Sequence, residues 1–492
     1  MYIVLLLAIP LAASSLFWLA GKSEKTVNII NAAASALLLA VAVLPVRDVL
    51  RYGKVNPDIF GGIFLIDSFN ALVLLITCLV SFLTSLYSIG YMKEETRRNG
   101  LPGRRLQLFY SLLHLFVFTM LLTTVTQNIG LMWIAVEATT LASAFLVGFH
   151  NNRKSIEAAW KYIIICSVGI AVALLGVILL YYSSVQALGK SIQGLNWQFL
   201  YDNAGSLHPN ILKIAFIFVL LGFGTKTGLA PMHTWLPDAH SQAPSPISAL
   251  LSGVLLNTAM YGIVRIMMIV NRNMGGSLFT GRLMMALGLV SIGSAAVFIL
   301  VQQDFKRTLA YSSIEHMGII ALGFGISSAL SVFAALLHIV NHSLTKSMLF
   351  AAAGNVNLRY GTKKIGRIRG ILKTMPVTGT VFLLGLFAIT GMPPFSIFTS
   401  ELGITIAAFK ASKYPAACLL LLFLALVFAG VAFRMLKMFF GTPARDNGAG
   451  ESDRLTPAVL LVFLTIIAVT GLFLPEPLNR LITSARDLIT NY

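Results

Sequence analysis

The segment LHIVNHSLTKSMLF (337–350) carries two histidines and a lysine in an otherwise apolar stretch. His338, His342 and Lys346 are spaced four residues apart, so a helix would place all three on one face, about one turn from each other. Histidine takes up and releases protons near neutral pH. If this face is turned toward a hydrated interior, the three side chains are suited to relaying protons.

Several other ionisable residues lie in similarly apolar stretches. A charged side chain in lipid costs on the order of 3 kcal/mol or more, so each one is a candidate functional group. Acids and bases occur in both halves of the chain, which favours proton transfer. The alternative for each residue is a structural role as a polar contact between helices. The candidate set is Glu137, Lys226, Glu315, His316, His338, His342, Lys346 and Glu401.

The sequence gives little reason to expect a metal or a cofactor. His338 and His342 have the HxxxH spacing of a metal-binding pair, but the glutamate of HExxH is missing and no third ligand is obvious. The three cysteines lie singly in apolar runs, which argues against a disulfide or an iron–sulfur site. No segment is typical of NAD or flavin binding. We therefore expect no resident metal and no cofactor.

The composition indicates which kind of protein must position these side chains. Charged residues make up 11% of the 492 residues, against about 25% in ordinary soluble domains, and hydrophobic residues make up 57%. This predicts an all-α membrane protein that crosses the bilayer many times. The net charge of +18 comes from basic residues in short loops between apolar runs. Such charges indicate how the chain is oriented in the membrane, and they do not indicate nucleic-acid binding.

About fourteen runs are long enough to cross some 30 Å of hydrocarbon. The first run lacks a basic start and a cleavage site, so we interpret it as a span and not as a signal peptide. The loops richest in Lys and Arg, at 93–105 and 359–373, predict a cytoplasmic side, with both termini outside the inner membrane. The expected spans are 1–20, 27–46, 67–90, 107–126, 128–148, 158–182, 211–229, 247–270, 283–301, 307–326, 328–353, 375–393, 416–438 and 456–475.

Spans 7 and 12 are interrupted by glycine and proline, in TKTGLAPMHTWLPDAH (225–240) and ITGMPPFSIFTSE (389–401). They lie five spans apart, and an odd offset reverses the direction of a span. Paired broken helices of this kind are typical of inverted repeats with an ion site between them. We therefore expect one membrane domain: three N-terminal spans (1–106), two five-helix repeats (107–270 and 283–438) and a last span (456–475), joined by a linker-like loop at 441–454.

Five motifs resemble the antiporter-like subunits that respiratory complex I, Mrp sodium/proton antiporters and group 4 hydrogenases share, especially the F-type subunit of hydrogenase-4. They cover spans 3 to 14 in the family's order. The resemblance implies that Glu137, Lys226, His338 with His342 and Lys346, and Glu401 carry a proton pathway. The motifs are SIEAAWKYIII, GTKTGLAPMHTWLPDAHSQAPSPISALLSG, QQDFKRTLAYSSIEHMG, HIVNHSLTKSMLFAAAG and GMPPFSIFTSELGI.

One position departs from the family pattern. Asn257 stands where related complex I subunits have a lysine in span 8. Either a wet link through Asn257, with Glu315 or His316 in place of the lysine, joins the two halves, or the pathway is interrupted here. The resemblance implies a proton-translocating subunit without a catalytic centre, working with other membrane subunits and indirectly with a soluble redox arm. The alternatives are a sodium-moving Mrp-type subunit and a scaffold subunit that does not pump.

Overall fold

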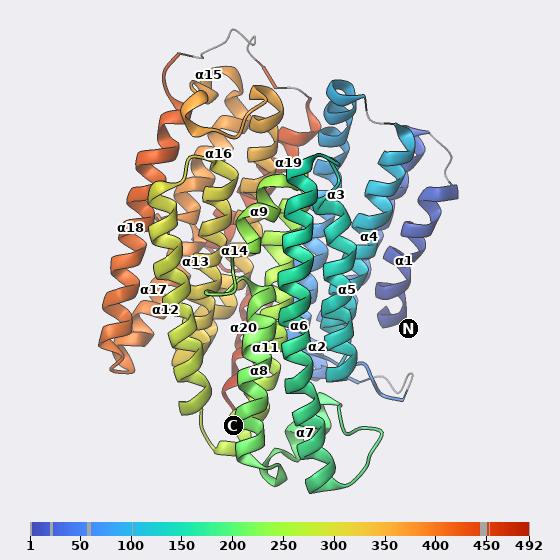
Figure 1. Ribbon diagram of the computed structural model, residues 1–492, viewed down its shortest axis with the longest axis vertical. Helices are drawn as coiled ribbons and strands as arrows, with labels where there is room; N and C mark the ends of the chain where they lie inside the picture. The colour runs from blue at the N-terminus through green and yellow to red at the C-terminus, as the bar shows by residue number, and fades with distance from the viewer. Residues whose placement is uncertain are drawn as a thin grey trace.

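The computed structural model describes residues 2–19, 23–56, 61–100, 102–442, 450–451 and 453–491. Helices run roughly along the long axis of the molecule, with α1 (Tyr2–Leu19) at one edge and α18 (Tyr414–Phe439) at the other (Figure 1). Most of the linker-like loop at 441–454 lies outside the described residues. The expectation of an all-α protein that crosses the membrane many times is confirmed.

Twelve helical segments within the described residues are long and apolar enough to cross a membrane. They correspond to twelve of the fourteen spans expected from the sequence. Two of these segments are α1 and α18. The others are α2 (Glu24–Tyr52), α3 (Ser68–Asn99), α4 (Gly103–Val125), α5 (Ile129–Val147), α6 (Arg153–Leu188), α8 (Pro209–Thr227), the joined α10 (Ser245–Leu250), η2 (Leu251–Leu255) and α11 (Leu256–Met274), α12 (Leu278–Val301), α13 (Phe305–Ile326) and α19 (Leu455–Leu472).

The two remaining expected spans differ from these for separate reasons. Helix α14 (Ala329–Tyr360) has 32 residues and is about 48 Å long, but its histidines, asparagines and lysine make it less apolar than the others. Its central turns are buried completely. Helix α16 (Pro376–Ile389) has 14 residues, too few to cross alone. Twelve of the fourteen expected spans therefore meet both criteria of length and apolarity, while α14 is long and buried but less apolar, and α16 is apolar but short.

The Gly and Pro segments of the sequence fall between helices. Helix α8 ends at Thr227, where Gly228 has a φ of 80° that only glycine adopts freely, and α9 (Trp235–Gln242) follows seven residues later. Helix α16 ends at Ile389, Gly391 has a φ of 67°, and α17 (Ser396–Lys410) begins after the prolines. Both segments therefore expose backbone carbonyls that a continuous helix would have bonded.

Glycines allow two pairs of helices to pack at backbone distance. A Cβ on Gly222 of α8 would lie 2.5 Å from the backbone nitrogen of Ala173 in α6. A Cβ on Gly288 of α12 would lie 2.7 Å from the carbonyl oxygen of Gly318 in α13. Small residues at such positions are typical of helix packing in membranes. These contacts fix α6 beside the end of α8, and α12 beside α13.

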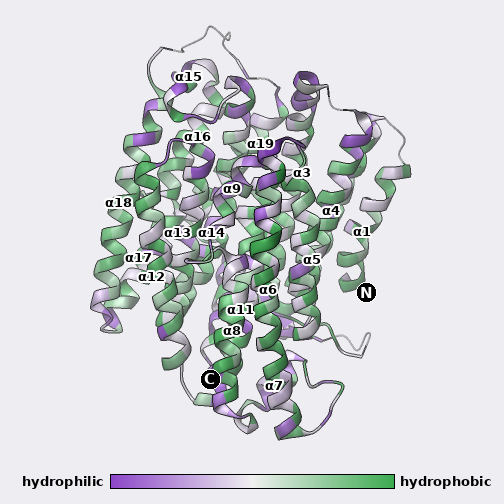
Figure 2. Cartoon of the chain, in the orientation of Figure 1, coloured by the Kyte–Doolittle hydropathy of each residue, from purple (hydrophilic) through white to green (hydrophobic). Residues whose placement is uncertain are grey.

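The outer helices are apolar along most of their length, while polar residues gather at the two ends and inside the bundle (Figure 2). Exposed hydrophobic side chains such as Trp160, Ile164 and Val168 line one face of α6. Such a surface suits contact with lipid. The shorter elements are β1 (Lys54–Val55), β2 (Ile66–Asp67), α7 (Trp197–Asp202), η1 (Ala204–Ser206), η3 (Ile365–Arg367), α15 (Ile371–Thr374) and α20 (Glu476–Thr490).

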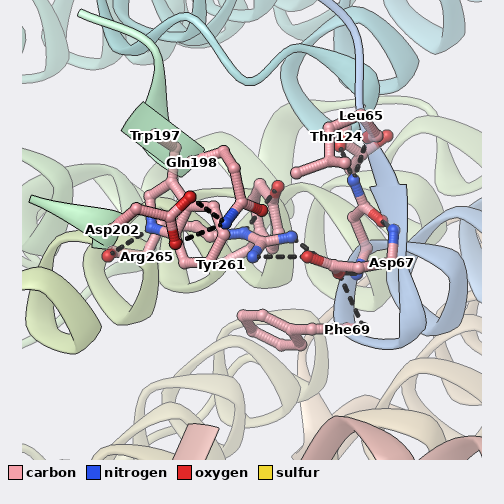
Figure 3. A network of polar contacts seen from close by, with 10 residues as sticks. Leu65, Asp67, Phe69, Thr124, Trp197, Gln198, Asp202, Tyr261 and Arg265 are labelled. Atoms are coloured by element: carbon pink, nitrogen blue, oxygen red, sulfur yellow. Dashed lines mark hydrogen bonds and ion pairs between the residues drawn. The ribbon is translucent and has the colours of Figure 1, made fainter. Parts of the chain in front are cut away.

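A buried ion pair ties α11 to the start of α3 (Figure 3). Two nitrogens of Arg265 lie 2.8 Å from the two carboxylate oxygens of Asp67, and Arg265 Nε donates to the hydroxyl of Tyr261 at 2.9 Å. The guanidinium carbon lies 4.4 Å from the ring centre of Trp197. Asp67 also caps α3 by accepting from two backbone N–H groups. The charge of Arg265 is thus neutralised inside the protein.

Candidate functional site

Lys226 occupies the last turn of α8, directly before the non-helical segment, and is completely buried. Its ammonium group donates to the hydroxyls of Tyr162 at 2.6 Å and Thr140 at 2.8 Å. The ring of Tyr162 also lies beneath the ammonium, 4.7 Å from nitrogen to ring centre. Tyr162 in turn bonds Ser143 at 2.7 Å. Within the described residues, hydroxyl groups and an aromatic face, and no carboxylate, contact the ammonium of this lysine directly.

Glu137 lies on α5, one turn before Thr140, and is partly exposed. One carboxylate oxygen accepts from Ser167 of α6 at 2.7 Å, and the other accepts from Thr140 at 3.3 Å. The hydroxyl of Thr140 therefore contacts both Glu137 and Lys226. The structure brings the predicted acid and base of the first half together through this hydroxyl and not as a direct ion pair.

Asn257 joins α11 to α14. Its amide nitrogen donates to Ser343 Oγ at 2.9 Å and to the carbonyl of Gly253 at 2.9 Å, while its amide oxygen has no partner in the part of the chain that the structure describes. A turn earlier, Ser252 bonds Ser313 of α13 at 2.7 Å. Small hydroxyl and amide groups thus lie where the related complex I subunits are expected to have a lysine.

His316 of α13 and His338 of α14 form the centre of the second half. His316 Nδ1 lies 2.9 Å from His338 Nε2, and His316 Nε2 lies 3.1 Å from the carbonyl oxygen of Ile389. A carbonyl only accepts, so in a neutral pair His316 carries its proton on Nε2 and His338 donates from Nε2. His338 Nδ1 then accepts from Ser400, 2.8 Å away on α17. The carbonyl of Ile389, at the end of α16, thereby fixes the direction in which these hydrogen bonds are donated.

Glu401 and His342 lie beside this pair and have unsatisfied atoms. Glu401 is 6% exposed and its Oε1 has no hydrogen-bond partner among the residues that the structure describes. One atom each of His316, His338 and Glu401 lies within 4.8 Å of the others. The ring of His342 is centred 5.5 Å from that of His316, and neither of its nitrogens has a partner. Buried polar atoms without a protein partner are typical of sites that hold water or an ion.

Lys346 and Glu315 lie close to these histidines but make different contacts. The ammonium of Lys346 donates to the carbonyl of Leu309 at 2.9 Å, and Glu315 accepts from Ser312 at 3.2 Å. Among the described residues, the carboxyl group that acts electrostatically on Lys346 is that of Glu315, and no ion pair joins Lys346 to Glu401. The hydrogen-bond partner of Lys346, the carbonyl of Leu309, therefore comes from α13.

The eight predicted ionisable residues thus fall into two groups, Glu137 with Lys226 and the other six around α14. His338, His342 and Lys346 are all fully buried, so the face that they share does not contact lipid. Sequence reasoning missed Thr140, Tyr162 and Ser400, whose types are common in any helix. It also found no obvious third ligand for His338, because His316 and Glu401 belong to other helices.

A polar hollow of about 420 Å³ opens at the end of the molecule that holds the basic loops. Glu95, His150, Lys306 and Lys363 are among its lining residues, and His150 Nδ1 lies 3.5 Å from Glu95. Burial, together with the charges of Lys306, Lys363 and Arg105, lowers the pKa of His150 to about 4. His150 is therefore neutral at pH 7, and its contact with Glu95 is not an ion pair at that pH.

Comparisons with known proteins agree with this architecture. Residues 126–437 match the family described as NADH:quinone oxidoreductase/Mrp antiporter, transmembrane, and residues 63–100 match the N-terminus of chain 5 of complex I. The chain is 40% identical over 415 residues to the hydrogenase-4 component F homolog of Methylacidiphilum infernorum, covering 84% of this chain and 86% of that protein.

Two solved structures resemble the fold along nearly the whole chain. A chain of the membrane-bound sulfane sulfur reductase, an archaeal respiratory complex, superposes with a TM-score of 0.88 at 26% identity, covering 99% of this chain and 97% of the other. A chain of the Mrp complex from Dietzia sp. DQ12-45-1b gives 0.87 at 20% identity, with the same coverage, and shows the fold alone. Family match, sequence identity and fold agree: the chain is an antiporter-like membrane subunit of the NADH:quinone oxidoreductase/Mrp antiporter family.

Proposed function

We propose that this chain translocates protons as a subunit of a membrane-bound, energy-converting oxidoreductase complex, such as a hydrogenase or a complex I-like enzyme. The observation that carries the proposal is the pair of buried clusters, one around Lys226 and one around His316 and His338. Each contains titratable groups joined by hydroxyls or imidazoles at hydrogen-bond distance. Such groups exchange protons without a metal or a redox cofactor.

In the first half, Lys226 holds a proton and Thr140 connects it to Glu137. In the second half, a proton that reaches His338 can pass to His316, because their facing nitrogens are 2.9 Å apart. Glu401 provides an acceptor nearby, while Lys346 and Glu315 are two further buried titratable groups beside the histidines. Asn257 and Ser343 serve as the neutral link between the halves, with water as the carrier of the proton.

The proposal includes an arrangement of the whole chain. It treats the chain as one membrane domain in which 107–270 and 283–438 are inverted repeats, with broken helices at the ends of α8 and α16. It places both termini outside the inner membrane, since the basic loops are expected in the cytoplasm. The energy comes from partner subunits. The names of the relatives support this, because one is a hydrogenase-4 component and another belongs to a respiratory membrane complex.

A second candidate, sodium transport, is favoured by one observation. The side-chain oxygens of Asn341, Ser396 and Glu401 are buried without hydrogen-bond donors around the start of α17. Oxygen atoms of this kind are the ligands that hard cations prefer. Sodium dependence of transport would favour this candidate over proton transfer alone.

The test uses the complete complex in sealed vesicles, with proton uptake and redox turnover measured together. Lys226→Met and Lys346→Met should each abolish most of the proton uptake while the partner subunits still turn over. Lys410→Met, at an exposed lysine of α17, is the matched control and should behave as wild type. Unchanged uptake in both buried-lysine variants would leave the chain as a scaffold subunit.

A further inference from the structure

The group formed by His316, His338 and Glu401 has a second property that proton transfer does not require. Its three ligand atoms come from α13, α14 and α17, and all lie within 4.8 Å of one another. A tetrahedral zinc ion holds such atoms about 3.3 Å apart, at bond lengths of about 2.0–2.1 Å. Shifts of well under 2 Å would therefore bring all three onto one ion.

We propose that His316 Nδ1, His338 Nε2 and a Glu401 carboxylate oxygen form a binding site for a divalent transition metal. The metal is Zn²⁺, and water occupies the fourth coordination position. Two imidazole nitrogens and one carboxylate form the donor set typical of zinc, whereas Mg²⁺ and Ca²⁺ select oxygen ligands. Glu401 Oε1 has no hydrogen-bond partner within the described ranges, so this oxygen can accept the ion.

The surroundings of the two histidines support this site. Histidines that bind metal almost always donate from their other ring nitrogen to a carbonyl, a carboxylate or water, which fixes the ring. His316 Nε2 already has the carbonyl of Ile389 at 3.1 Å. His338 Nδ1 has the hydroxyl of Ser400 at 2.8 Å, and Ser400 can itself donate to the carbonyl of Ile397 at 2.9 Å. Both rings are thus held in the orientation that turns the facing nitrogens, which hydrogen-bond each other in the absence of metal, toward one ion.

Zinc and protons compete for the same atoms in this arrangement. Zinc needs His338 with its proton on Nδ1 and a bare Nε2, and it needs Glu401 ionised. The hydrogen bond between the two histidines is then replaced by the ion. We expect zinc to bind more tightly as the pH rises and, once bound, to block proton exchange between His316 and His338.

The test measures zinc on the purified full-length chain, so its outcome does not depend on transport. After equilibration with ZnCl₂ and gel filtration, elemental analysis should find one tightly held zinc per chain, and X-ray absorption should find two histidine nitrogens among its ligands. His338→Gln and Glu401→Gln should remove this zinc. Ser400→Ala, which removes the hydroxyl supporting His338, should weaken binding by about 10- to 100-fold.

Two other histidines provide matched controls. His114 is equally buried but bonds Asn31 on α2, and His150 lies with Glu95 in the polar hollow. His114→Gln and His150→Gln should keep the bound zinc. Loss of the zinc in His150→Gln, its retention in both His338→Gln and Glu401→Gln, or absorption spectra with oxygen ligands alone would overturn the proposal. The wild-type spectrum decides the matter if the cluster variants fail to fold.

Discussion

Lys226 and Glu137 do not touch each other, although they are the buried base and the acid of the first half. The hydroxyl of Thr140 lies between them, 2.8 Å from the ammonium and 3.3 Å from the carboxylate. A hydroxyl can accept a proton on one side as it releases one on the other. The coupling of these two charged residues therefore depends on a neutral side chain.

Thr140→Val tests this relation, because valine keeps the shape of threonine and removes the hydroxyl. A hydrogen bond to a charged group contributes about 1.5–3 kcal/mol, so we expect proton uptake by the assembled complex to fall by about 10- to 100-fold. Thr140→Ser retains the hydroxyl and should transport normally. Wild-type uptake by the valine variant would mean that Glu137 and Lys226 communicate by another route.

Asn257→Leu tests the neutral link between the halves. The change removes the donor that serves Ser343 Oγ and the Gly253 carbonyl, which should cost about 1–3 kcal/mol of stability. Thermal unfolding in detergent measures that cost. Vesicle assays should find proton uptake lowered as well, since an apolar side chain cannot hold water. A stable variant with full uptake would show that protons do not pass this residue.

Asp67→Asn separates the charge of the buried ion pair from the helix cap. Asparagine still caps α3, but it leaves the guanidinium of Arg265 without a counter-ion, so stability should fall by about 3–5 kcal/mol. Arg480→Ala is the control, because Arg480 and Glu476 are 62% and 64% exposed and such a pair contributes about 1 kcal/mol or less. Equal unfolding temperatures for the two variants would contradict the assigned role of Asp67.

His150 predicts a pH dependence of stability. Its pKa is lowered from 6.5 to about 4, so the unfolded chain binds its proton more readily than the folded one. Stability should therefore fall as the pH drops from 6.5 to about 4, and the contribution of neutral His150 to stability is complete above pH 6.5. His150→Gln should flatten the profile of unfolding temperature between these pH values. An unchanged slope would assign the acid sensitivity to other groups.

The amino-acid sequence by itself determined the class of protein and which ionisable residues share one face of a helix. Long apolar runs with few charges have no stable place outside a bilayer, and four-residue spacing fixes His338, His342 and Lys346 on one side of α14 wherever that helix lies. Glycine and proline fixed where α8 and α16 end, because both residues change the backbone locally.

The tertiary structure decided which side chains meet. Spacing along a helix does not give the rotation or height of its neighbours, so the sequence could not predict that His316 faces His338, that Ser400 bonds it, or that Lys346 bonds the carbonyl of Leu309 and not Glu401. Those contacts depend on how closely α13, α14 and α17 pack, which is set by small residues throughout the bundle. Thr140 became a candidate in the same way, because a common residue type gains a role only from its neighbours.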